Sequence, residues 1–292
     1  MSSLNEVQQA LENNTTLSSS SKSVYRSNYK RLMSITDNEP IKNFSQKRII
    51  EILDNADIPA SSKNGMVTVV LLIRNMDELD SEKIIEFREK KVRRDRYKEK
   101  EAQNRKLQLD LPSLDTLEKY TKHLLNEGDY VSYIVNFLLL RFGVRNRDLN
   151  ILITTDKSKT YVGNKAKMNY LYVTHKYITY IRNDYKTFDT YGRKVHKMEL
   201  RLFVRAVKEV LGDKVEVPLL ASRENDDVIS ESSLSQTIQR KTFDQLGEGK
   251  YFKIILQDLK KKGNIKKIRD IAKTRGTDLE TIFAEYDIAE KV

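Results

Sequence analysis

The sequence predicts a mainly α-helical protein with a small antiparallel β-sheet, folded as two domains. Its 292 residues exceed what one minimal core needs, and 39% are hydrophobic, enough to build real cores. Apolar residues recur at helical spacing toward both ends of the chain. Between residues 151 and 198, β-branched and aromatic residues alternate with polar ones, as in strands.

The N-terminal domain is predicted to be wholly helical and to cover residues 22–90. Residues 1–21 end in a run of serines and threonines and are expected to form a flexible N-terminus. Ser45 is expected to cap a helix over 46–53. Another apolar helix is expected over 66–74, so this domain holds about four helices.

A charged helical linker is predicted over residues 91–111, and Pro112 marks its end. The wider stretch 82–106 holds eleven Lys or Arg and six Asp or Glu, a net charge of +5, with neither Gly nor Pro. Such a stretch fits an exposed helix with internal ion pairs, and its positive balance also fits a connector lying against phosphates. We expect it to combine both roles.

The C-terminal domain is predicted over residues 112–292, with a sheet between two groups of helices. It is the part of the chain in which strand and helix patterns alternate. The expected helices are 114–126, 130–142, 199–211, 233–246, 251–262, 265–274 and 279–286, and the expected strands are 151–154, 161–162, 170–173, 177–182 and 194–198, with a turn at 189–192.

Composition limits the function. The formal net charge is +11, and the pI of about 9.4 favours polyanionic partners. The chain has no cysteine and three histidines, which excludes disulfides and thiolate metal sites and argues against a histidine-rich metal cluster. No secretion signal or membrane-spanning run is expected. We therefore expect a protein of the cytoplasm or nucleus, and its lysine- and asparagine-rich composition suits a mobile element or a virus.

One segment carries a motif with a chemical meaning. Residues 142–149, Phe-Gly-Val-Arg-Asn-Arg-Asp-Leu, end one helix and begin another. They resemble the Thr-Gly-hydrophobic-Arg-x-x-Glu-Leu box of the tyrosine recombinases, the lambda-integrase-like family. The resemblance implies that Arg145 binds the scissile phosphate, with Asp148 in place of the usual Glu. A planar guanidinium suits this role because it holds two phosphate oxygens at once.

The resemblance also implies a lysine on a β-hairpin that protonates the leaving 5′-oxygen of the DNA. Lys186-Thr187 matches the Lys-Thr that is frequent in the family, so Lys186 is the candidate. Lys165 and Lys167 are rivals in the preceding hairpin.

Two more motifs of the family have counterparts that differ from its pattern. Lys250 stands where the family has His, as in related type IB topoisomerases, and Lys253 stands where it has Arg. Lysine keeps the positive charge but loses the bidentate fork. At the end of the chain Arg275-Gly276-Thr277 aligns with Leu-Gly-His, and Tyr286 follows nine residues later, where the family has its nucleophile. Thr277 can donate one hydrogen bond but cannot act as an acid or base.

The resemblance thus implies an enzyme that cuts and rejoins double-stranded DNA through a 3′-phosphotyrosyl intermediate, without cofactor or metal. It further implies a helical core-binding domain at 22–90 that clamps the duplex, and self-assembly on DNA as a dimer or tetramer. The basic stretch 259–275 is expected to form one DNA-facing patch. Two alternatives stay open: a catalytically impaired DNA-binding or architectural protein of this fold, and a basic helical protein that binds protein or RNA.

Overall fold

A computed structural model describes residues 7–8, 11–12, 14, 17, 19–160, 168–222 and 228–286. The chain divides into two compact units, residues 1–103 and 104–292. The expected strand at 161–162 and the two rival lysines of the preceding hairpin, Lys165 and Lys167, lie outside the described residues.

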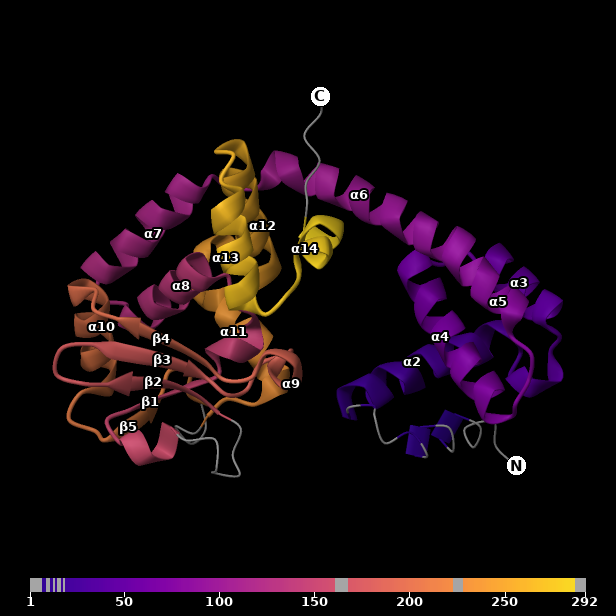
Figure 1. The fold of residues 1–292 in the computed structure, drawn as a ribbon, viewed down its shortest axis with the longest axis horizontal. Helices are drawn as coiled ribbons and strands as arrows, with labels where there is room; N and C mark the ends of the chain where they lie inside the picture. Colours follow the sequence, from indigo (N-terminus) through magenta and orange to yellow (C-terminus); the bar gives the residue numbers. More distant parts are fainter. Residues whose placement is uncertain are drawn as a thin grey trace. The chain divides into compact units, whose positions relative to one another are not determined.

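The regular elements in the described part of the first unit are all helical (Figure 1). Helix formation there extends further than the apolar patterns indicate: α2 begins three residues before Lys22, and α4 begins at Ala60 rather than at 66. Its elements are α2 (Ser19–Ile35), the 3₁₀ turn η1 (Ile41–Asn43), α3 (Gln46–Asn55), α4 (Ala60–Met76), α5 (Glu82–Phe87), the π-helical η2 (Arg88–Val92) and α6 (Arg93–Asp110), which continues into the second unit.

Helix α4 is the centre of the first unit. Its apolar side is buried against α2, α5, η1 and η2. Buried Arg74, near the end of α4, closes the adjoining loops by donating to the Phe44 carbonyl at 3.0 Å and to the Asp80 carbonyl at 2.6 Å. Ser45 caps α3 as predicted, since its side chain accepts from the Arg48 N–H. The charged stretch is helical, as predicted from the absence of Gly and Pro.

The second unit combines helices with a sheet. The predicted helices over 114–126, 130–142 and 279–286 and the strands over 151–154 and 194–198 have the predicted bounds. Its elements are α7 (Leu114–Asn126), α8 (Tyr130–Phe142), η3 (Asn146–Leu149), β1 (Ile151–Thr154), η4 (Lys157–Thr160), β2 (Asn169–Val173), β3 (Ile178–Arg182), α9 (Phe188–Tyr191), β4 (Lys194–Met198), α10 (Arg201–Leu211), β5 (Glu216–Pro218), α11 (Glu231–Lys241), η5 (Phe243–Gln245), α12 (Glu248–Lys261), α13 (Ile265–Arg275) and α14 (Leu279–Tyr286).

The sheet is mixed, and the prediction of an antiparallel sheet was wrong. Its described strands run in the order β4-β3-β2-β1-β5, and β1 pairs with β2 in parallel. The other pairs are antiparallel. A parallel pair requires a connection of about a dozen residues or more, whereas a tight hairpin would make the pair antiparallel, and in the sequence residues 155–168 separate β1 from β2.

Two further local predictions differ from the structure. Strand β5 was missed because it is only three residues long and ends in Pro218, a residue that is tolerated on an edge strand. The turn expected at 189–192 is the short helix α9 followed by Gly192, because the chain between β3 and β4 is long enough for one helical turn.

Helix α8 organises the packing of the second unit, with helices layered on the sheet (Figure 1). It is buried along most of its length and contacts α7, α10, α11, α12 and α13. Helix α10 packs on α8 and also on β1, β2 and β5, so it joins the helical layer to the sheet. This arrangement brings the end of α8, the start of β4 and the end of α13 into one region.

The turn between α13 and α14 is a tight, fully hydrogen-bonded helix end. Gly276 adopts φ +70°, its N–H donates to the Lys273 carbonyl at 3.3 Å, and the Thr277 N–H donates to the Ala272 carbonyl at 3.1 Å. These two bonds make a Schellman motif, which favours glycine at the left-handed position. Gly276 therefore adopts a backbone conformation that other residues rarely adopt.

We predict that Gly276→Ala destabilises the protein more than Gly263→Ala. Both glycines have positive φ, so each substitution costs roughly 1–2 kcal/mol. An added Cβ at Gly276 would lie 2.6 Å from Thr187 Oγ1, and this clash should cost about 1–3 kcal/mol more. An added Cβ at Gly263 would have no neighbouring atom within 4 Å. Urea unfolding of both variants measures the difference. Equal losses of unfolding free energy would show that the turn is not closely packed.

Candidate functional site

Arg145 lies where the box motif leaves α8. The helix ends at Phe142, and Gly143 adopts the left-handed conformation at its C-cap. Arg145 is the N-cap residue of η3, and its N–H donates to Asp148 Oδ2 at 2.7 Å. Asp148 is therefore an N-terminal capping residue of this short turn, which explains why an acid belongs three residues after the arginine. The Arg145 side chain remains partly exposed.

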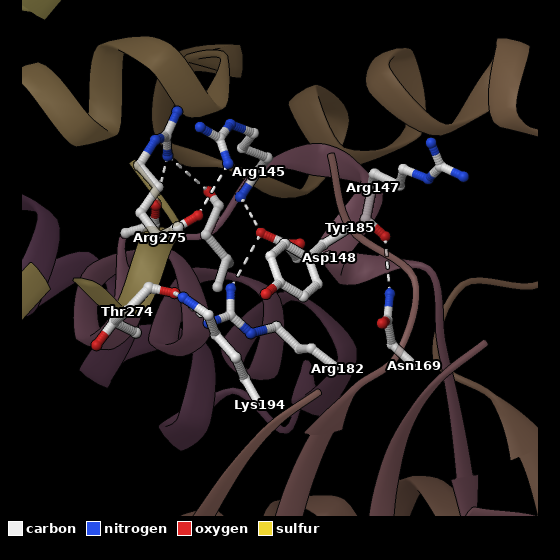
Figure 2. A network of polar contacts seen from close by, with 12 residues as sticks. Arg145, Arg147, Asp148, Asn169, Arg182, Tyr185, Lys194, Thr274 and Arg275 are labelled. Carbon is white, nitrogen blue, oxygen red and sulfur yellow. Dashed lines mark hydrogen bonds and ion pairs between the residues drawn. The ribbon is translucent and has the colours of Figure 1, made fainter. Parts of the chain in front are cut away.

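Three cations, which we call the α13 cation cap, bind the last carbonyls of α13: Arg145, Arg182 and Lys194. Figure 2 shows them converging on this helix end from α8–η3, β3 and β4. Arg145 Nη1 donates to the Arg275 carbonyl at 2.8 Å, and Lys194 Nζ donates to the Thr274 carbonyl at 3.2 Å. Arg182 Nη2 also donates to the Thr274 carbonyl. Since the last carbonyls of a helix have no partners within it and carry partial negative charge, cations are favourable there.

The free-energy cost of burying the charge of Arg182 is offset by a carboxylate and aromatic rings of the same cluster. Its side chain is fully buried, and Nη1 lies 3.4 Å from Asp148 Oδ2. The guanidinium also lies over the rings of Tyr185, at 5.2 Å, and Tyr180, at 5.8 Å. Burial raises the pKa of the Asp148 carboxyl, and the charge of Arg182 opposes that rise. Asp148 therefore joins the box motif to the sheet.

Arg275 is buried, so its predicted place in a surface patch was wrong. It has no exposed surface, and its guanidinium donates to the carbonyls of Gly143 and Val144 at the end of α8. It also pairs with Glu248 at 3.1 Å and stacks over Phe252 at 4.1 Å. Other cations of this stretch are exposed as predicted: Lys260, Lys261, Lys262, Lys266, Lys267, Arg269 and Lys273.

Lys194 has an environment that suits proton transfer. It begins β4 directly opposite Arg182 in the strand register. Burial, together with the nearby charges of Arg182 and Arg145 and against the opposing effect of Asp148, lowers the pKa of its ammonium to about 8. A lysine with such a pKa is still charged at neutral pH but gives up its proton far more readily than an ordinary lysine.

The remaining predicted site residues are spread around this cluster. Lys186 is exposed, but its neighbour Thr187 donates to the Gly276 carbonyl at 2.8 Å. The Lys186 segment thus reaches the α13–α14 turn. Thr277, the next residue of that turn, is buried.

The two lysines of α12 differ in exposure. Lys250 is exposed in the first turn of the helix, and Lys253 is half-buried. Burial and the charge of Lys250 lower the pKa of the Lys253 ammonium. Tyr286 is the last residue of α14, and its side chain lies outside the described part of the structure.

Sequence reasoning did not identify Arg182, Lys194 and Glu248 as members of the site. One feature of the sequence could have indicated Arg182. It is a charged residue at the end of a mostly apolar strand, Ile178–Arg182, and a charge buried there requires a partner. Lys194 and Glu248 carry no local signal, because each becomes special only through contacts with Thr274 and Arg275, far along the chain.

The described part of the chain contains neither a cluster of metal-ligating side chains nor a helix that could span a membrane. Within it, no three His, Asp or Glu side chains come together as a metal site would require. None of its helices combines the length and apolar character that crossing a bilayer demands.

Comparisons with known proteins add little to these observations. No protein-family profile and no curated protein matches the chain. Among solved structures, it is similar to the crystal structure of XerA recombinase, with 12% sequence identity and a TM-score of 0.38, over 99% of this chain and 94% of that one. A likeness at this TM-score carries no argument about function, which must come from the site.

We predict that Lys194 is the more reactive of two lysines on β4. At pH 8 about half of Lys194 is the free amine, which is the reactive form. For Lys197 a hydrogen bond from its ammonium to Glu199 raises the pKa, so its free-amine fraction is far smaller. Brief acetylation with acetic anhydride, read by peptide mass spectrometry, should modify Lys194 first. Slower modification of Lys194 than of Lys197 would contradict the lowered pKa.

Proposed function

We propose that the protein breaks and rejoins double-stranded DNA, with Tyr286 as the nucleophile that forms a 3′-phosphotyrosyl link. The observation that carries the proposal is the convergence of Arg145 and Lys194 on the turn that leads into α14, the helix that ends at Tyr286. A phosphate-binding cation and a lysine of lowered pKa therefore lie one short helix away from the proposed nucleophile. A cation that binds the phosphate and a lysine that gives up a proton are two of the groups that phosphoryl transfer to a tyrosine uses, which supports the proposal.

The proposed reaction balances without a cofactor. The Tyr286 phenol loses its proton to solvent, and its oxygen forms a bond to phosphorus while the bond from phosphorus to the 5′-oxygen breaks. The leaving oxygen takes a proton from the Lys194 ammonium. Rejoining reverses these steps, so the phosphotyrosyl bond conserves the energy of the broken linkage.

Arg145, Lys250, Lys253 and Thr277 take the electrostatic roles in this proposal. Arg145 holds two non-bridging oxygens, and the lysines at the start of α12 add positive charge to the same group. Thr277 contributes a hydrogen bond. Lys186 is the alternative general acid, supported by the contact of its neighbour Thr187 with the α13–α14 turn.

DNA affinity is proposed to come from exposed lysines and arginines, chiefly the exposed cations of residues 260–273. They supply contacts to the phosphate backbone that do not depend on sequence. The helical unit 1–103, with the charged helix at its end, is proposed as the second arm of a DNA clamp. Assembly as a dimer or tetramer on DNA belongs to the same proposal.

A DNA-binding protein without strand-cleavage activity is the second candidate. Two observations favour it: Lys253 lacks the bidentate fork of an arginine, and Thr277 is buried and offers only a hydroxyl. The loss of a single donor to a reacting phosphate costs roughly 10²–10³ in rate. Binding and cleavage must therefore be measured separately.

We predict that the protein forms a covalent adduct with a nicked suicide DNA duplex and that Tyr286→Phe abolishes the adduct. Removing the phenol oxygen removes the nucleophile but leaves the ring, so DNA binding should persist. Denaturing gel electrophoresis detects the adduct, and a mobility shift measures binding. Binding without an adduct in the native protein would favour the second candidate, and an adduct that survives in Tyr286→Phe would assign the nucleophile elsewhere.

We predict that Lys194→Met slows adduct formation by roughly 10²–10⁴, the usual contribution of a general acid. A substrate with sulfur in place of the bridging 5′-oxygen should restore the rate, because a thiolate leaves without being protonated. Lys186→Met is the matched control and should change the rate little. If the sulfur substrate restored the rate of adduct formation in Lys186→Met but not in Lys194→Met, Lys186 would be the general acid.

A further inference from the structure

We infer that Arg275, held by Glu248, is a positioning residue: it fixes Arg145 for phosphate binding without touching the phosphate. This inference rests on the proposed function for its catalytic consequence. The structural basis of the inference is independent of that function, because Arg275 is fully buried and its side chain points away from solvent into the junction of three segments.

Arg275 contacts the Arg145 segment twice. Its carbonyl accepts a hydrogen bond from Arg145 Nη1 at 2.8 Å. Its own Nη1 donates to the Gly143 carbonyl and, at 3.2 Å, to the Val144 carbonyl, the two residues that precede Arg145. One residue therefore holds both the backbone that leads to Arg145 and the guanidinium at the end of its side chain.

Glu248 connects this arrangement to α12. Its carboxylate oxygens lie 3.1 and 3.4 Å from Arg275 Nη2, and the Phe252 ring packs against the guanidinium. Burial raises the pKa of the Glu248 carboxyl, while the charge of Arg275 opposes that rise. Since α12 also carries Lys250 and Lys253, the pair sets their helix against the Arg145 segment.

The chemistry explains why an arginine is needed at this position. The resemblance to tyrosine recombinases places a leucine there. A leucine could not donate to the carbonyls of Gly143 and Val144, which Arg275 satisfies. A buried guanidinium needs a carboxylate, and Glu248 provides it. Arg275 and Glu248 therefore act as one unit, because the guanidinium holds the Gly143 and Val144 carbonyls and the carboxylate compensates its charge.

The test uses Glu248→Gln in the full chain, since glutamine keeps the shape and one acceptor but loses the charge. Selective ¹⁵N-arginine labelling gives the guanidinium resonances of Arg145, assigned with Arg145→Lys. In the native protein the two Nη groups of Arg145 should be resolved, because the hydrogen bond to the Arg275 carbonyl restricts rotation. In Glu248→Gln they should merge. Asp258→Asn, which removes an ion pair to Lys262 on the same helix, is the control and should leave them unchanged.

The catalytic consequence is measured as the rate of adduct formation at saturating suicide duplex, with DNA affinity measured in parallel. Glu248→Gln should lower the rate roughly 10- to 100-fold, as misplacement of a catalytic group does, and should leave the affinity within about twofold. Asp258→Asn should leave the adduct rate at saturating duplex unchanged.

The outcomes separate this inference from the proposed function. Unchanged Arg145 resonances in Glu248→Gln would overturn the positioning role, whether or not the native protein forms an adduct. Merged resonances in a protein that forms no adduct would sustain the positioning role and refute the proposed function. A native adduct rate that Glu248→Gln leaves intact would overturn the inference while the proposed function stands.

Discussion

The structure of the second unit depends on one interaction, the binding of the α13 carbonyl end by cations from distant segments. Arg145 comes from the end of α8, Arg182 from β3 and Lys194 from β4, and all three donate to carbonyls of residues 273–275. Arg145 joins the helical layer to this helix end, and Arg182 and Lys194 join the sheet to it. The position of α14 follows directly, because only the Schellman turn at Gly276 separates the two helices.

Burying the charged groups of this cluster costs free energy, and each buried guanidinium is therefore paired with a carboxylate. Arg182 and Arg275 have no exposed surface, and each meets one carboxylate, from Asp148 and Glu248 respectively. Removing one partner of such a buried pair typically costs about 3–5 kcal/mol, because the other charge is left without compensation. The site is consequently part of the folding core of its unit, and changes to its charges affect stability as well as chemistry.

Local signals in the sequence predicted the elements well and their long-range pairing poorly. The bounds of α7 and α8 were predictable because Ser113 and Asp129 cap them and apolar residues follow at helical spacing. The parallel pairing of β1 with β2 and the burial of Arg275 were not. Arg145 meets Arg275 across 130 residues of sequence, and no local pattern records such a contact. Motif order made Arg145 a candidate, and only packing shows which lysine lies beside it.

The end of α13 acts as an internal counter-ion for the cations that would receive a phosphate. Its carbonyls carry about half a unit of negative charge, against the full charge of a DNA phosphate. The affinity of the cluster for any anion is therefore the difference between two sets of acceptors that compete for the same donors. The geometry of the last turn of α13 would thus tune the affinity of the cluster for a phosphate through backbone carbonyls alone.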